Sequence, residues 1–378
     1  MVPSSLHQLL LDGGVRLPAP QAVVLEDIDP ARIHRGVTLH PGVTLRGRDT
    51  LLGPGTDLGR AGGGLFENLA CGRGVALWGG SAQDAVCLEG VVMRGQAELR
   101  GGTLLEEGCQ GGQAVGLKMS VLLANTALGS LINFCDVLMA GGPSPAEHSE
   151  VGSCMALYNF SPQGDKWASL FGDIVGGLAG RSDPVFVGGQ TQVVSPLRVG
   201  AGSAIAAGAA LRRDLPAGRL HADPGPALDQ AFDAALYGPL ARKLEVTAEV
   251  VASLEACLAW YGKVRRAWAR AGEAWEAPLI EAAVGQLGAG IVERVHRLDR
   301  LVSKLPASLA GHRDRLDGAV DAESRAWHQR CLDEQLALLD RWPRRRTAWI
   351  SAAVPLGAGS RDAPETPPGS QVARPALA

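Results

Sequence analysis

The sequence predicts a mainly β protein, in which a parallel β-helix of hexapeptide repeats is followed by an α-helical C-terminal domain. Three observations predict this fold. An aliphatic residue opens most six-residue units over much of residues 31–222. Glycine is frequent, with 50 residues, whereas aromatic residues make up only 4% of the chain, a composition that favours tight turns around small interior side chains. Beyond residue 225, apolar residues recur three or four positions apart, as on one face of a helix.

The six-residue repeat is clearest near the start of the β region. The units from Ile33 and Leu39 read I-H-R-G-V-T and L-H-P-G-V-T, and the register returns at Cys87 and again at Val187. Each unit is expected to form one short strand and one turn, so that three units complete a triangular coil whose opening aliphatic residues stack inside the prism. An antiparallel β-sandwich is the alternative, but it requires two-residue alternation and longer spacing between turns.

The chain divides into four predicted segments. These are an N-terminal cap segment at 1–30, the β-helix at 31–222, an α-helical bundle or hairpin at 223–350, and a disordered tail at 351–378 that is rich in Pro, Gly, Ala and Ser. Two stretches inside the β-helix, 134–150 and 173–184, break the period and carry Gly, Pro and Ser. They are predicted to be loops, and loops on a rigid solenoid are where a binding site would be built.

Charge and cysteine usage exclude several classes of function. The formal net charge of −3 gives no electrostatic case for nucleic acid or an anionic membrane as partner. The seven cysteines are scattered without a C-x-x-C pair, which indicates reduced thiols rather than a zinc site or disulfides. No histidine pair has metal-ligand spacing, so no metal is expected. Without a signal segment or a membrane-length apolar run, the expected location is cytoplasmic.

Two runs resemble a known family. They are L-R-G-G-T-L-L-E-E-G from Leu99 and V-G-A-G-S-A-I-A-A-G from Val199. They are similar to the C-terminal acetyltransferase half of the bacterial bifunctional UDP-N-acetylglucosamine pyrophosphorylase and glucosamine-1-phosphate N-acetyltransferase. The resemblance covers about 96–161 and 184–218. It implies a left-handed β-helix, a hand that also fits short flat strands, together with a homotrimer, acetyl-CoA as co-substrate, and a phosphorylated amino sugar or its nucleotide as ligand.

The resemblance also implies a binding site. Arg100 falls on the family arginine that holds the sugar phosphate, and Lys118 falls on a lysine that contacts the same phosphate region. Asn159 matches the asparagine of the family's C-N-Y element, and Lys166 fits the next family lysine if the loop is one residue longer. Ala207 falls where the family backbone lines the acetyl-CoA groove. An arginine fork and two ammonium groups suit a phosphate dianion, whereas the alternative is that each is an ordinary surface cation.

The turn A-L-G-S-L-I-N departs from the family pattern. Ser130 stands where the family has its general-base histidine, and Asn133 stands where it has a tyrosine, so both are retained only as candidate substrate-binding residues. A serine hydroxyl is a poor base near neutral pH. The nearest catalytic candidate is His148, in the long loop that follows, oriented by Glu147 or Glu150 from the same or an adjacent subunit. The alternative is that His148 is a solvated loop histidine.

Three functions stay open on these grounds. The first is an acyltransferase with a relocated base, of the N-acetyltransferase type that uses acetyl-CoA. The second is a binder of a phosphosugar or nucleotide sugar that has no catalytic activity. The third is a trimeric scaffold that contacts a protein partner through its C-terminal helices. The chain has no G-x-G-T-R-M run, so UTP chemistry is not expected.

Overall fold

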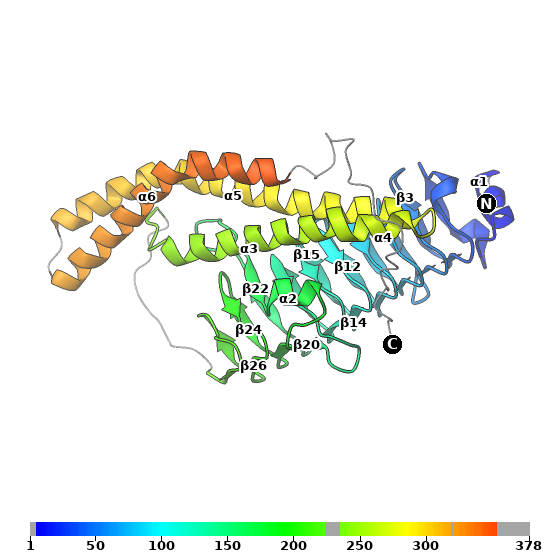
Figure 1. Ribbon diagram of the computed structural model, residues 1–378, viewed down its shortest axis with the longest axis horizontal. Helices are drawn as coiled ribbons and strands as arrows, with labels where there is room; N and C mark the ends of the chain where they lie inside the picture. Colours follow the sequence, from blue (N-terminus) through cyan, green and yellow to red (C-terminus); the bar gives the residue numbers. More distant parts are fainter. Residues whose placement is uncertain (1–4, 224–234, 319–320, 354–378) are drawn as a thin grey trace, which may run out of the picture.

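The computed structural model describes residues 5–223, 235–318 and 321–353. Over these residues a parallel β-helix is followed by long helices that lie along one of its sides (Figure 1). The predicted order of a β-helix and then C-terminal helices is therefore confirmed. Of the tail predicted for 351–378, the part beyond residue 353 lies outside the described residues.

Three parallel sheets form the sides of the prism, and the chain visits them in the order A, B, C. Within the described residues, sheet A contains β2 (Thr38–Leu39), β5 (Asp57–Leu58), β8 (Ala76–Leu77), β11 (Val92–Met93), β14 (Gln110–Gly111), β17 (Thr126–Leu128), β20 (Ser149–Val151), β23 (Phe186–Val187), β26 (Ala204–Ile205) and β28 (Leu220–His221). Sheet B contains β1 (Val24–Glu26), β3 (Val43–Arg46), β6 (Gly64–Glu67), β9 (Gly80–Gln83), β12 (Ala97–Leu99), β15 (Gly116–Lys118), β18 (Asn133–Cys135), β21 (Ala156–Tyr158), β24 (Gln192–Val194) and β27 (Ala210–Leu211). Sheet C contains β4 (Leu51–Leu52), β7 (Ala70–Cys71), β10 (Ala85–Cys87), β13 (Thr103–Leu105), β16 (Val121–Leu122), β19 (Val137–Met139), β22 (Ser169–Phe171) and β25 (Arg198–Val199).

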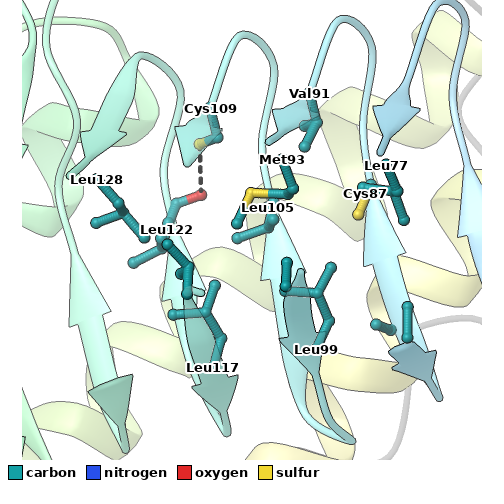
Figure 2. Close-up of a cluster of buried hydrophobic side chains, with 14 of the residues drawn as sticks. Leu77, Cys87, Val91, Met93, Leu99, Leu105, Cys109, Leu117, Leu122 and Leu128 are labelled. Atoms are coloured by element: carbon teal, nitrogen blue, oxygen red, sulfur yellow. Dashed lines mark hydrogen bonds between the residues drawn. The ribbon is translucent and has the colours of Figure 1, made fainter. Parts of the chain in front are cut away.

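The interior of the prism is a stack of aliphatic side chains. Leu99 on sheet B pairs in register with Leu117 on the next coil, and both are fully buried. Figure 2 shows such residues from all three sheets pointing toward the same axis, with the Cys109 thiol donating to the Leu122 carbonyl over 3.6 Å. Burial of apolar side chains on successive coils stabilises the prism.

The coils differ in length, so the six-residue period is followed only in part. Glu98 pairs with Gly116, 18 residues later, whereas Val43 pairs with Gly64, 21 residues later. Three insertions are longer, at 140–148, 159–168 and 172–185, and the last contains the short helix α2 (Ile174–Leu178). Because strand pairing fixes the sheet positions, the extra residues fall in the corners between the sheets.

The corner from sheet B to sheet C imposes a special backbone conformation. Asn68, Asp84, Met119 and Asp136 occupy this corner on different coils with φ of 47°, 48°, 51° and 62°. This left-handed region favours glycine, asparagine and aspartate. The backbone conformation therefore accounts for an aspartate at position 136. The Asp136 carboxylate also pairs with two arginines of the C-terminal helices, as described below.

Helices cover the N-terminal end and one side of the prism. The N-terminal helix α1 (Ser5–Asp12) buries Leu10 in the same core as the first coils, and two short 3₁₀ turns follow, η1 (Pro20–Ala22) and η2 (Pro30–Arg32). After the β-helix, α3 (Ala241–Trp260) runs through the π-helical turn η3 (Tyr261–Arg265) into α4 (Arg266–Arg270). The remaining two helices are long, α5 (Glu276–Asp317) and α6 (Ala322–Ala353). Within the described ranges, no helix combines the length and apolar character needed to cross a bilayer.

Helices α3 and α5 pack against the outer face of sheet C, and α6 packs against α5 (Figure 1). A second core forms there from apolar residues of both layers, including Leu104, Val121, Leu138, Leu254, Leu287 and Val295. Helix α5 also follows the B-to-C corner, where the Gln286 side chain donates to the Asp84 carbonyl and accepts from the Gly102 amide. The helices thus occupy one side of the prism, next to the corner that carries the candidate site.

Candidate anion-binding site

The structure places the candidate residues at three different corners of the prism. Arg100 directly follows β12 and Lys118 ends β15 at the B-to-C corner, and Asn159 and Lys166 lie in the insertion at this same corner. Ser130 and Ala207 lie at the A-to-B corner, on different coils. His148 lies at the C-to-A corner, in the insertion before β20. Within one chain, the B-to-C group is therefore separate from the proposed catalytic histidine.

Arg100, Lys118 and Cys135 form one row on the outer face of sheet B, which we call the sheet B row. Lys118 pairs in register with Cys135, and Arg100 follows Leu99, whose partner is Leu117. Because side chains alternate along a strand, the buried leucines point inward and the row points outward. Neighbouring positions in the row are therefore separated by one strand spacing, about 4.8 Å.

The same row has balanced charge nearer the N-terminus. Arg46 lies between Glu26 and Glu67 on adjacent coils, with its guanidinium 2.8 Å from the Glu26 carboxylate and 3.8 Å from that of Glu67. Gln83 follows on the next coil and donates to Glu67 over 3.2 Å. Opposite charges in facing positions stabilise a sheet, so this part of the row needs no ligand.

Farther along the sheet B row, Arg100 and Lys118 are two positive residues in neighbouring positions, so acidic and basic residues no longer alternate. Arg100 has a carboxylate neighbour in Glu98, at 3.7 Å, on its own strand. In the described ranges, no carboxylate lies within 4 Å of the Lys118 or Lys166 ammonium group. Like charges in facing positions destabilise a sheet unless an anion lies between them. Arg100 and Lys118 are therefore two cations in neighbouring positions, of which only Arg100 has a carboxylate within 4 Å among the described residues.

Cys135 is the member of the row that the sequence patterns did not indicate. Arg100 Nη2 lies 4.0 Å from its sulfur. Burial and the Asp136 carboxylate raise the pKa of this thiol, against the opposing charges of Arg100, Lys166 and Lys118. Raising its pKa keeps the thiol protonated near neutral pH, although the charges of all three cations act on it. The sequence spacing could have predicted that Cys135 lies beside Lys118, because the two residues are about one coil apart.

Asn159 has a structural role at this corner. It is buried, and its side-chain amide donates to the Asp136 carboxylate. Phe160 and Lys166 then pair as a small antiparallel hairpin, which Lys304 of α5 fixes by donating to Asp165 over 3.0 Å. Asn159 therefore positions the hairpin, in which Lys166 is one of the residues exposed to solvent.

Beneath the corner, α5 contributes two buried arginines that the sequence analysis missed. Arg297 Nη1 lies 2.6 Å from Asp136 Oδ1, and Arg294 Nη2 lies 3.9 Å from the same oxygen. All three side chains are at least nine-tenths buried. The signal in the sequence was a pair of arginines three positions apart on an otherwise apolar helix face, a pattern that indicates a buried partner for both.

The A-to-B corner carries an open groove of about 480 Å³. Its lining contains small or polar residues: Ser153, Cys154, Gly189, Gln190, Ala207 and Gly208. Ser130 lies one coil away, where its hydroxyl accepts from the Gln113 amide over 3.1 Å and its own amide donates to Ser153 Oγ. The groove is thus open and lined by small or polar residues, and the Ser130 hydroxyl already takes part in a hydrogen bond within the corner.

His148 is held within its own loop. Its Nδ1 lies 2.9 Å from the Pro145 carbonyl, and its Nε2 lies 3.8 Å from the Glu150 carboxylate. The strand that follows this loop, β20, pairs with β17, and Ser130 comes after the far end of β17. Within one chain, His148 therefore lies at the N-terminal ends of the sheet A strands, and Ser130 lies at their C-terminal ends.

No family model matches this chain, and no curated protein matches it. The fold and the site by themselves define its class. It is a parallel β-helix protein that carries helices on one sheet and the adjacent cations Arg100 and Lys118 on the outer face of another. Across the described ranges, no group of three or more His, Cys, Asp or Glu side chains is arranged to bind a metal ion.

Proposed function

We propose that this protein binds a phosphorylated amino sugar, or the corresponding nucleotide sugar, on the outer face of sheet B. The observation that carries the proposal is the break in the charge pattern of the sheet B row. Arg100 and Lys118 are adjacent there, the charge of Lys166 also acts on the neighbouring Cys135, and Glu98 is the carboxylate within 4 Å of Arg100 among the described residues, so a phosphate dianion would balance the lysine charges. The arginine fork would bind two phosphate oxygens, and the ammonium groups would act as point charges.

The sugar ring would lie along the strand, toward the A-to-B corner. Asn133 is exposed on the same face as Cys135, two residues away along β18, a distance of about 6.6 Å that is on the scale of one sugar ring. Its neighbour in register is Gly116, which has no side chain, so the surface beside Asn133 is recessed. We assign Asn133 to the sugar hydroxyl or amino groups, with Ser130 beyond it at the corner.

Acetyl transfer would be a second step in this proposal. The groove at Ala207 would take the acetyl-CoA chain, because its small lining residues leave the backbone accessible. A base would still be required, and a His148 that acts on this substrate would have to come from an adjacent subunit. Binding is therefore the primary proposal, and catalysis depends on the assembly.

The assembly we propose is a homotrimer of left-handed β-helices. Its support is that the helices cover sheet C, which leaves sheets A and B to pack against other copies of the chain (Figure 1). Light scattering at micromolar concentration is expected to give three times the mass of the chain. A monomer in this measurement would contradict the trimer and remove any catalytic route through a neighbouring His148.

Arg100→Ala is expected to weaken binding of glucosamine-1-phosphate and of UDP-N-acetylglucosamine by about 10- to 100-fold. The physical reason is the loss of a charge-assisted hydrogen bond, which contributes about 1.5–3 kcal/mol. Isothermal titration calorimetry measures the affinities, and ligand-induced shifts in melting temperature provide a second readout. Arg46→Ala is the matched control, because Arg46 lies in the same row but is paired with Glu26 and Glu67.

Equal affinities for the Arg100 and Arg46 variants would place the ligand elsewhere. No binding of either ligand to the unaltered protein would favour the scaffold function instead. One observation supports that second candidate. The α5–α6 hairpin extends past the C-terminal coils of the β-helix in Figure 1 and so presents a helical surface that the prism does not cover.

A further inference from the structure

Two histidines face each other near the tip of the α5–α6 hairpin, and we call them the histidine pair. His312 of α5 is fully buried, and His328 of α6 is 8% exposed. Their Nδ1 atoms lie 2.8 Å apart, which is a hydrogen-bonding distance. The ring of Trp327 lies against both imidazoles, with centroid distances of 5.4 and 4.9 Å. The two helices are therefore joined here by a hydrogen bond between imidazoles that is largely shielded from solvent.

The histidine pair also holds the segment that leads into α3. Nε2 of His312 lies 2.8 Å from the Tyr237 carbonyl, which accepts from Gln335 of α6 as well, over 2.8 Å. The Tyr237 amide donates to Ser308 Oγ of α5 over 2.9 Å. Tyr237 is itself 4% exposed, so these bonds lie in the interior. Three elements of the helical domain thus meet at one buried cluster of hydrogen bonds.

The geometry limits the number of protons that the histidine pair can hold. A carbonyl oxygen only accepts, so Nε2 of His312 carries a hydrogen and donates to Tyr237. In the neutral pair, Nδ1 of His312 is then the acceptor, and Nδ1 of His328 is the donor. One added proton fits on Nε2 of His328, but a second would place hydrogens on both Nδ1 atoms, directly facing each other. The closed arrangement therefore takes up at most one proton, whereas two separated histidines take up two.

The charged groups around the histidine pair do not offset a second positive charge. Among the described residues, no carboxylate lies within 4 Å of either imidazole. Arg315 on α5 adds a positive charge, and burial, His312 and this arginine all lower the pKa of His328. On α6, the Glu334 carboxylate accepts from two amides at the start of α3. The Tyr237 hydroxyl, from the segment before α3, stays neutral because burial raises its pKa.

We propose that the histidine pair is an acid-sensitive switch, which holds the tip of the α5–α6 hairpin closed at neutral pH and releases it as the pH falls below about 6.5. The open form binds more protons than the closed form, so the stability of the closed form falls with decreasing pH. Opening separates α5 from α6 and frees the Tyr237 carbonyl. It would change the helical surface that the hairpin presents beyond the prism (Figure 1). The switch is independent of the proposed ligand site, because neither histidine belongs to the sheet B row.

Hydrogen exchange of the full chain at about pH 7.5 and about pH 5.5 tests the switch. The results are expressed as protection factors, which correct for the effect of pH on the chemical exchange rate. Protection of amides in 308–316 and 324–335 is expected to fall by about tenfold at the lower pH. This is the shift produced by uptake of one extra proton about one pH unit below the histidine pKa. Residues 279–295 of α5, which pack on sheet C, are expected to keep their protection.

His328→Gln removes one titrating group and keeps a side chain that can form hydrogen bonds, so this variant is expected to lose the acid response. His296→Gln is the matched control, because His296 is an exposed histidine on α5. Each variant is compared with itself at the two pH values, so a hairpin that is already looser in His328→Gln still gives a result. Unchanged protection in the unaltered protein would overturn the proposal. An acid response of equal size in the two variants would also overturn it and assign the response to other groups.

Discussion

Asp136→Ala is expected to destabilise the folded protein by about 3–5 kcal/mol. This is the effect of removing one partner from a buried ion pair, because the other partner then remains charged in a low-dielectric interior. Here the loss is concentrated at one atom, since Oδ1 of Asp136 serves both Arg294 and Arg297. The Asn159 amide loses its acceptor in the same change, so the hairpin insertion is expected to loosen as well.

Urea unfolding measures this effect, and hydrogen exchange in residues 159–166 checks the loosening of the hairpin. Asp84→Ala is the matched control. Asp84 occupies the same corner with a similar left-handed backbone, so alanine introduces the same conformational strain at both positions, but its exposed carboxylate accepts from Asn68 alone among the contacts described for it. A similar loss of stability in both variants would show that the corner backbone, and not the buried charge, accounts for the effect.

Tyr261→Ala is expected to cost about 3–5 kcal/mol of stability, as is usual when a large ring is deleted from a packed interior. Tyr261 is fully buried between the helical layer and the β-helix, and its hydroxyl donates to Glu106 Oε1 over 2.6 Å. Burial raises the pKa of both groups. The Glu106 carboxyl group also accepts from the Ala124 amide over 3.0 Å, so the Tyr261–Glu106 contact joins η3, at the end of α3, to two coils of the prism.

Tyr261→Phe separates the two parts of this effect. It keeps the ring and removes the hydroxyl, so about 1–3 kcal/mol of the loss is expected to remain. Tyr158→Ala is the control, because Tyr158 is 53% exposed on sheet B and its deletion leaves no cavity. Chemical denaturation measures all three variants. The docking role of Tyr261 is contradicted if Tyr261→Ala unfolds at the same denaturant concentration as Tyr158→Ala.

The parallel β-helix was predictable because its signal is local and repeated. Each inward residue such as Leu99 or Leu117 has the same surroundings as its neighbour one coil away, so many weak matches in the sequence support one structure. The helices were predictable for a related reason, since their apolar residues recur at the helical period. Coil lengths were less predictable, because a corner can absorb an extra residue without disturbing the strands on either side.

The candidate site could be predicted only in part. Arg100 and Lys118 lie one coil apart, so once the period was known their proximity followed from the sequence, and Cys135 could have been added by the same spacing. The separation of His148 from Ser130 could not be read in this way. Which corner a loop occupies depends on the number of residues in the preceding coils, and these numbers vary along the chain.

The sequence by itself determined that the chain forms a β-helix with helices after it, and that cations recur at coil spacing on one face of that β-helix. The tertiary structure alone decided how the helices lie on the prism. By placing α5 along the B-to-C corner, it brought Arg294 and Arg297 to Asp136 and turned a corner aspartate into the centre of a buried charge cluster. The physical reason is that a repeat specifies contacts between neighbours one coil apart, whereas contacts between a distant helix and the prism depend on packing that no local period records.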